Sequence, residues 1–170
     1  TIRRGEDWEL NLRIRQAGHL VWFDPALSVT YWPRESWSRL ARQFRATGAW
    51  RGELVRRFGR RNGLRFFAPP ALVVVTAAAL LVGILQLVGV LRGIAALIAS
   101  VIYLPLIAYA LLVIGVGVVS PGPVRQRLWT MAVLPTMHLS WGLGFIGGAL
   151  RGAGDTVDAS RLGSRNTPLP

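Results

Sequence analysis

The sequence predicts a mostly α-helical membrane protein, in which a helix, two short strands and an amphipathic helix precede three membrane-spanning helices. Three uncharged apolar runs carry this prediction, and they cover residues 66–91, 93–124 and 128–150. A helix needs roughly 20 apolar residues to cross about 30 Å of hydrocarbon, so each run is long enough. Three such runs in succession favour membrane spans over a buried helical core. We expect the spans near residues 68–89, 94–117 and 128–149.

Helix breakers flank these predicted spans. Pro69 and Pro70 stand at the start of the first span, where a missing backbone N–H costs little. The stretch "SPGP" at residues 120–123 predicts a turn before the third span. We therefore expect a three-helix transmembrane region over residues 66–150.

The charges are unevenly distributed along the chain. All 20 basic residues are arginines, the formal charge is +12, and no acidic residue lies between Glu53 and Asp155. An arginine excess beside apolar helices is typical of a cytoplasmic segment next to membrane spans. The alternative of nucleic-acid binding is disfavoured because no recognition motif is present. Since the chain has no Cys, a disulfide framework and a thiolate metal site are both excluded.

The arginine bias also predicts an orientation in the plasma membrane. Residues 1–65 carry most of the arginines and are expected in the cytoplasm. The tail, residues 151–170, is small, polar and ends in proline, so we expect it to be disordered and to lie outside.

An acidic pair, Glu6 and Asp7, opens the first predicted helix. Apolar residues then recur at helical spacing, and Gly18 supplies a stop. Acidic side chains in a first turn interact favourably with the helix dipole, so capping alone would explain the pair. Two short strands should follow, "HLVWF" at 19–23 and "LSVTYW" at 27–32, with a turn at Asp24 and Pro25 between them.

A basic amphipathic helix is predicted after these strands. Ser36 is a plausible N-cap, and aromatic and aliphatic residues share one face while arginines occupy the rest. Gly48 is expected to interrupt the helix. A basic helix with Trp and Phe, close before a span, is expected to lie on the bilayer surface.

The third span carries two further features. Gly144, Gly148 and Gly152 stand four residues apart, which predicts close packing against the other spans. His138 lies in the same span. An ionisable residue there is a functional candidate, but a neutral histidine bonded to a neighbouring helix is the more ordinary interpretation.

Residues 1–65 cannot bury much apolar area alone, and the two strands need a sheet to join. We therefore expect this chain to be the C-terminal part of a larger protein. The stretches that bear on its family are "GEDWELNLRIRQAGHLVWFDPALSVTYWPR", "ARQFRATGAWR", the three spans and "HLSWGLGFIGG". In this order they resemble the C-terminal half of membrane-anchored family 2 glycosyltransferases of the succinoglycan and exopolysaccharide type.

The resemblance implies a fold and a chemistry. Residues 1–65 would be the C-terminal part of a GT-A catalytic domain with an interface helix. Its partners would be a nucleotide-sugar donor, a glycan or polyprenyl-linked acceptor and the lipid bilayer, with no nucleic acid. A divalent cation, Mg or Mn, would be held by an Asp-x-Asp motif that this chain lacks, so none is expected to bind here. By position, Asp7 would be the general base of an inverting transfer, with Glu6 as supporting neighbour.

Five further residues are candidates for substrate binding. They are Trp8, Gln43, Arg45, Trp50 and Arg51. Trp8 could stack on a sugar ring, and the other four stand where related enzymes carry a Gln-x-x-Arg-Trp motif, although that motif is not complete here. An arginine near a diphosphate is chemically sensible, but a basic face on anionic lipid headgroups explains these positions equally well.

Two functions from different classes therefore remain open. One is the membrane glycosyltransferase, with the donor-binding half absent from this chain, so that the chain alone is expected to be inactive. The other is a non-catalytic membrane scaffold or helper with a basic arm on the membrane surface. The donor sugar, the acceptor, the linkage and the oligomeric state are not determined by the sequence.

Overall fold

A computed structural model describes residues 6–30, 36–58 and 64–154, and within these ranges every regular element is a helix. The elements in chain order are α1 (Glu6–Gln16), α2 (Trp37–Phe58), η2 (Leu64–Phe67), α3 (Ala68–Leu87), α4 (Gly93–Ala99), η3 (Ser100–Tyr103), α5 (Leu104–Val119) and α6 (Val124–Arg151). The predicted disordered tail falls almost wholly on residues 155–170, which lie outside the described residues.

The first predicted helix is confirmed as α1, and its end has a clear local cause. Gly18 adopts a positive φ of 82°, which glycine reaches without steric cost. This conformation lets the Gly18 N–H bond the Arg15 carbonyl and the His19 N–H bond the Ile14 carbonyl. That pair of bonds is a Schellman motif, which satisfies carbonyls left open at a helix end.

The two predicted strands are wrong for residues 19–30, which form no strand. The turn between them is present, because the Asp24 carboxylate accepts a hydrogen bond from the Ala26 N–H at 2.9 Å. The apolar side chains around the turn are largely exposed: Leu20 by 92%, Trp22 by 87% and Val29 by 91%. A strand needs a neighbour to pair its backbone groups, and among the described residues none is alongside.

The amphipathic helix is confirmed as α2, with Ser36 at its start. The Ser36 hydroxyl accepts a hydrogen bond from the Arg39 N–H at 3.4 Å, as an N-cap does. The predicted interruption at Gly48 is wrong, since α2 continues to Phe58. Gly48 instead lies against the backbone of Trp141 in α6, where no larger side chain fits.

Three helices are long and apolar enough to cross a membrane, as predicted, and they cover Leu64–Leu87, Gly93–Val119 and Val124–Arg151. These apolar helices indicate association with a lipid bilayer. Pro69 and Pro70 lie in the first turn of α3. A turn between Val119 and Val124 joins α5 to α6, also as predicted.

The first two apolar segments form a hairpin that is linked by a polar cluster. The Gln86 amide donates to the Ser100 hydroxyl at 2.9 Å and to the Ala96 carbonyl at 3.0 Å, and it accepts from the Tyr103 hydroxyl at 3.2 Å. Among apolar surroundings, polar side chains are stabilised by bonding one another across helices. The cluster therefore joins α3 to α4 and η3 near the tip of the hairpin.

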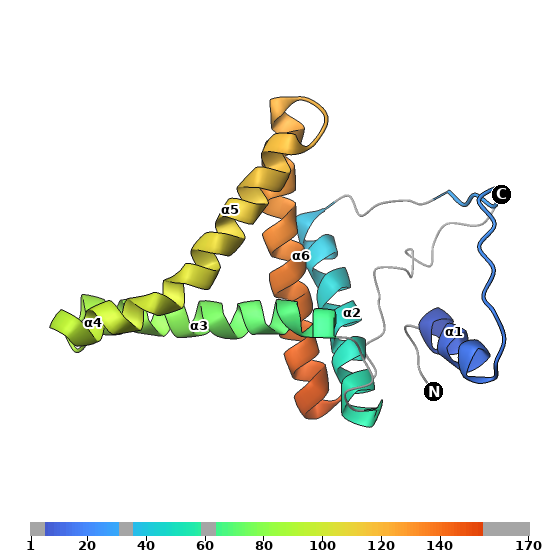
Figure 1. The fold of residues 1–170 in the computed structure, drawn as a ribbon, viewed down its shortest axis with the longest axis horizontal. Coiled ribbons are helices and arrows are strands. Elements are labelled where there is room, and N and C mark those ends of the chain that lie inside the picture. The colour runs from blue at the N-terminus through green and yellow to red at the C-terminus, as the bar shows by residue number, and fades with distance from the viewer. Residues whose placement is uncertain (1–5, 31–35, 59–63, 155–170) are drawn as a thin grey trace, which may run out of the picture.

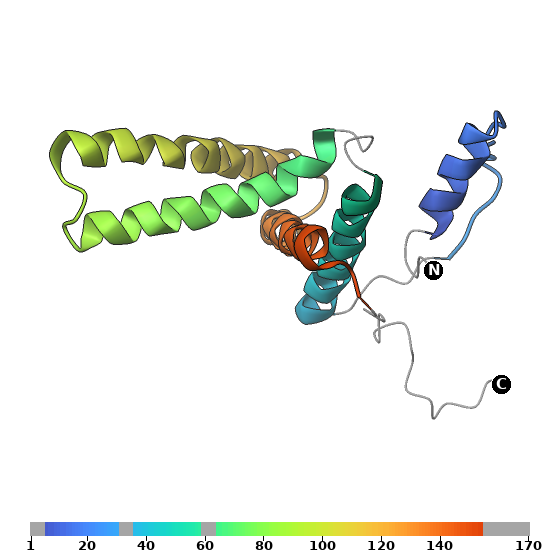
Figure 2. The same ribbon diagram turned by 90° about the horizontal axis from the view of Figure 1, so that it is seen from below.

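The third apolar helix has a different direction. Figure 1 shows α6 running across α3 rather than alongside it, and Figure 2 shows α6 nearly end-on while α3 extends away to one side. The helix α6 contacts α3, α5 and α2, and it lies between the hairpin and α2. The start of α3 and the end of α5 therefore each meet α6, and α2 lies on the other side of α6.

Helices α2 and α6 run parallel and are in contact over nearly their whole length. At one end the Trp37 and Trp129 rings lie 5.6 Å apart, and at the other Gly152 lies beside Glu53 and Arg56. Between these ends the two backbones touch at glycines of both helices. These glycines are Gly48 and Gly52 of α2 and Gly144 and Gly148 of α6.

The glycine spacing in α6 correctly predicted close helix packing. The predicted partner, another membrane span, is wrong for Gly144 and Gly148. Gly144 and Gly148 meet the backbone of α2, at Arg45 and Ala49, rather than another span. Gly142, which the spacing did not single out, provides the close contact with α3 at Pro69 and Val73.

Candidate functional site

The second half of α2 is the most buried part of the described chain. Gly48, Gly52 and the side chains of Trp50, Arg51 and Glu53 are all buried there. Burial on every side of a helix is unusual for a segment this rich in charge. We define residues 48–57 of α2, with Arg65 and Phe66 of η2, as the charged cluster.

Arg51 is held in this cluster by an aromatic ring. Its guanidinium lies 3.5 Å from the centroid of the Phe66 ring, and the Arg65 guanidinium lies 4.9 Å from the same centroid. A cation over a ring face is attracted by the ring quadrupole. Burial, and then the nearby charge of Arg65, lower the pKa of Arg51 to about 10. Arg51 therefore stays charged at neutral pH.

Glu53 is the one acidic residue of the charged cluster and is only 2% exposed. Its carboxylate accepts hydrogen bonds from Arg56 at 2.9 and 3.0 Å and from Arg57. The bonds from Arg56 and then Arg57 lower its pKa from an ordinary 4.5 to about 2, although burial alone would raise it. The same carboxylate lies near Gly152, so it also abuts the end of α6.

Four of the predicted substrate-binding residues lie on this one helix. Gln43 and Trp50 are seven residues apart and so share a face of α2. Gln43 is partly buried, Arg45 is exposed, and Trp50 and Arg51 are buried. The structure therefore brings these residues onto one helix, and it leaves Arg45 the most accessible of them.

The predicted catalytic residues lie elsewhere. Glu6, Asp7 and Trp8 form the first turn of α1, and their side chains lie outside what the structure describes. Among the described elements, α1 makes no extensive contact with another helix.

The described residues hold no group of three or more His, Cys, Asp or Glu side chains that could bind a metal ion. The carboxylate of Glu53 already forms salt bridges with Arg56 and Arg57. No described part of the chain therefore fits the divalent cation that the resemblance implies for a larger enzyme.

Sequence reasoning missed the role of Glu53. The sequence analysis assigned Glu53 no role, and its spacing of three and four residues from Arg56 and Arg57 was the signal that could have indicated a double partner. The ordinary interpretation of His138 is supported: its Nδ1 lies 2.8 Å from the Tyr109 hydroxyl of α5. This contact ties α5 to α6.

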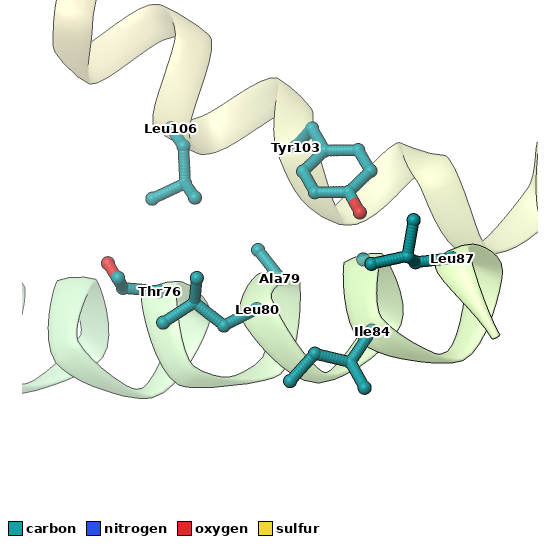
Figure 3. A pocket seen from close by; sticks show the side chains of 8 residues that line it. Thr76, Ala79, Leu80, Ile84, Leu87, Tyr103 and Leu106 are labelled. Atoms are coloured by element: carbon teal, nitrogen blue, oxygen red, sulfur yellow. The ribbon is translucent and has the colours of Figure 1, made fainter.

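A groove also opens between α3 and the η3–α5 segment. Figure 3 shows Ala79 of α3 pointing toward Tyr103 and Leu106 across it, with Leu80 beside it on α3. Its walls are almost entirely apolar and carry no charged side chain. Such an apolar groove suits hydrocarbon.

No protein-family model, curated protein or solved structure matches the chain. The functional interpretation therefore rests on the residues and on their arrangement.

Proposed function

We propose that this chain is the acceptor-side and membrane-anchoring part of an inverting membrane glycosyltransferase. In this role it would act with a GT-A domain that binds a nucleotide-sugar and would serve cell-surface polysaccharide synthesis. The sugar would pass to a glycan or polyprenyl-linked acceptor at the cytoplasmic face of the plasma membrane.

One observation carries the proposal. The helix that bears Glu6 and Asp7 is followed at once by an extended segment, residues 19–30, whose large apolar side chains are exposed. A contiguous apolar patch of this kind marks a surface that another part of a protein covers. In a GT-A domain the covering part would be the central sheet, and it would fix the acidic helix at the sheet edge.

The proposed chemistry follows from the acidic pair. A sugar hydroxyl is a weak nucleophile, and a carboxylate positioned to take its proton accelerates attack by roughly 10²–10⁴-fold. Asp7 would supply that carboxylate, Glu6 would support it, and Trp8 would offer a ring for stacking. The acceptor hydroxyl would lose its proton to Asp7 as its oxygen bonds the anomeric carbon. The bond from that carbon to the nucleoside diphosphate would break at the same time, and the diphosphate would leave with the bonding electrons.

Helix α2 would form the membrane-side wall of the site. Arg45 is exposed, and an exposed guanidinium can bind the oxygens of a diphosphate with two parallel hydrogen bonds. Gln43 lies close to it along the helix. Trp50 and Arg51 are buried, so they would act by holding α2 in place.

The test is a pair of matched substitutions in the protein that includes the donor-binding domain. Asp7→Asn should lower sugar transfer by about 10²-fold or more while donor binding is kept, because only proton transfer is lost. Asp24→Asn makes the same chemical change at a turn whose capping oxygen Asn retains, so its transfer rate should be near normal.

Near-normal transfer by Asp7→Asn would exclude Asp7 as the base. Equal, large losses of transfer in both variants would assign the effect to folding rather than to the base. If the protein showed no sugar transfer at all while membrane association persisted, the non-catalytic membrane scaffold would be the better account.

A further inference from the structure

We infer that α2 and α6 form one platform that lies in the plane of the membrane surface, against anionic lipid headgroups, so that the chain crosses the bilayer twice and α6 does not cross. The two crossings would be α3 and the α4–η3–α5 segment. This inference is independent of the proposed catalytic function.

The direction of α6 is the first argument. The most apolar parts of the chain are α3 and α5; α3 would follow the membrane normal, and α5 would cross at an incline to it (Figure 1). Helix α6 runs across α3, meeting it near Gly142. If α3 crosses the bilayer, α6 therefore lies closer to the membrane plane than to the normal.

The pairing with α2 is the second argument. The two helices touch through backbone atoms at four glycines. Because they are packed this closely, α2 must lie at the same depth in the membrane as α6. A transmembrane α6 would take the middle of α2, with Arg42, Arg45 and Arg51, into the hydrocarbon. Arginines on a helix at the bilayer centre are strongly disfavoured. At the surface the exposed Arg42 and Arg45 would reach headgroups, while Arg51 would stay buried against Phe66.

The distribution of tryptophan agrees with this placement. Helices α2 and α6 contain four of the seven tryptophans, Trp37, Trp50, Trp129 and Trp141, whereas residues 64–123 contain none. Tryptophan is enriched where a bilayer meets water, because its ring is apolar and its N–H is polar. Helix α6 also carries more polar side chains than α3 or α5, His138 and Thr136 among them.

The charges identify the partner as an anionic surface. The elements α2, η2 and α6 together hold ten arginines and a single acid, Glu53, which is buried and paired. On α2, Arg39, Arg42 and Arg45 are exposed. Basic amphipathic helices gain affinity from anionic lipids. The far tip of the hairpin carries only Arg92, so the arginine bias places the platform at the cytoplasmic face.

The inference has a consequence that departs from the expectation of three crossings. With two crossings, residues before α2 and residues after α6 lie on the same side of the membrane. With three crossings they lie on opposite sides, and the tail is outside.

The test is single-cysteine labelling in cells, which is clean because the chain has no Cys. The variants are Ser36→Cys before α2, Val90→Cys at the hairpin tip and Ser160→Cys in the tail. A membrane-impermeant maleimide should label Val90→Cys in intact cells. It should label Ser36→Cys and Ser160→Cys only after permeabilisation.

Labelling of Ser36→Cys and Ser160→Cys from opposite sides would overturn the inference. Labelling of both in intact cells would overturn the assignment to the cytoplasmic face.

A depth measurement tests the platform itself. A variant with Trp141 as its only tryptophan is placed in vesicles of neutral and anionic phospholipid. Lipids brominated near the headgroup should quench Trp141 at least twofold more strongly than lipids brominated near the chain end. Stronger quenching by the deep bromine would contradict an in-plane α6, because Trp141 lies well inside the predicted third span.

Discussion

Replacing Gly148 with alanine tests the backbone contact between α2 and α6 at a single position. A Cβ at Gly148 would lie 2.6 Å from the carbonyl carbon of Ala49 and nearer still to its oxygen, closer than real Cβ atoms come. These are backbone atoms, so no side-chain rotation can relieve the clash. The helices must move apart, and the close contacts at Gly144 and Gly52 weaken with them.

The neighbouring Gly147 is a matched control. A Cβ there has nothing within 4 Å, although it lies on the same helix one residue away. Gly147→Ala should stabilise the protein by up to about 1 kcal/mol, since alanine is the better helix former. Gly148→Ala gains the same propensity but overpacks a tight contact, which costs typically 1–3 kcal/mol or more. The difference between the variants should therefore be about 2 kcal/mol.

The assay is thermal unfolding of the purified chain in one detergent, followed by the loss of monodisperse protein after heating. The midpoint should rise slightly for Gly147→Ala and fall for Gly148→Ala. Equal midpoints for the two variants would refute the backbone contact, because propensity alone does not distinguish adjacent positions of one helix.

Three further predictions concern other parts of the chain. The pKa of Glu53 is lowered from 4.5 to about 2 in the folded protein, so its stabilising effect is complete above about pH 4.5 and is lost as pH falls towards 2. The melting midpoint should therefore fall over this pH range more for the wild type than for Glu53→Gln. Parallel pH profiles of the two proteins would contradict the pairing of Glu53 with the arginines. Tyr109→Phe should cost roughly 0.6 kcal/mol, an average value for a hydrogen bond between membrane helices, and its effect should vanish when His138→Phe is already present; additive losses would show that the two residues do not interact. The 170-residue chain alone should not turn over a nucleotide-sugar, because it lacks an Asp-x-Asp motif, and product formation by the purified chain would contradict this.

The apolar helices could be predicted from sequence because their length and composition are local properties. Residues 64–87 and 93–119 follow the uncharged runs, and Pro69 and the turn at 120–123 lie where expected. The end of α1 was predictable for the same reason, since Gly18 determines it within four residues.

The pairing of α2 with α6 could not be predicted in the same way. Gly48 and Gly52 stand four residues apart just as Gly144 and Gly148 do, but a glycine in a charged helix was interpreted as an interruption. Which surfaces meet depends on residues about 95 positions apart in the chain, and spacing within one helix does not contain that information. The two strands failed for a related reason, because a strand forms only beside a partner.

The candidate site was predicted in part. Gln43, Arg45, Trp50 and Arg51 share one helix, although an interruption at Gly48 was expected between the first two and the last two. The burial of Trp50 and Arg51 was not foreseen either, and Glu53 was overlooked. Arg51 lies against Phe66 of η2, and Gly48 and Gly52 lie against α6, so the burial of this part of α2 depends on tertiary contacts that composition does not reveal.

The membrane placement depends on α2 and α6 lying in parallel, and cross-linking measures this directly. In the Cys-free chain, Trp37→Cys with Trp129→Cys should be joined in membranes by a bifunctional thiol reagent long enough to replace the two rings, because the ring centroids lie 5.6 Å apart. Trp37→Cys with Leu150→Cys should not be joined, since the second site is displaced by roughly 30 Å along α6. Cross-linking of the Trp37–Leu150 pair, or failure of the Trp37–Trp129 pair, would contradict the parallel platform.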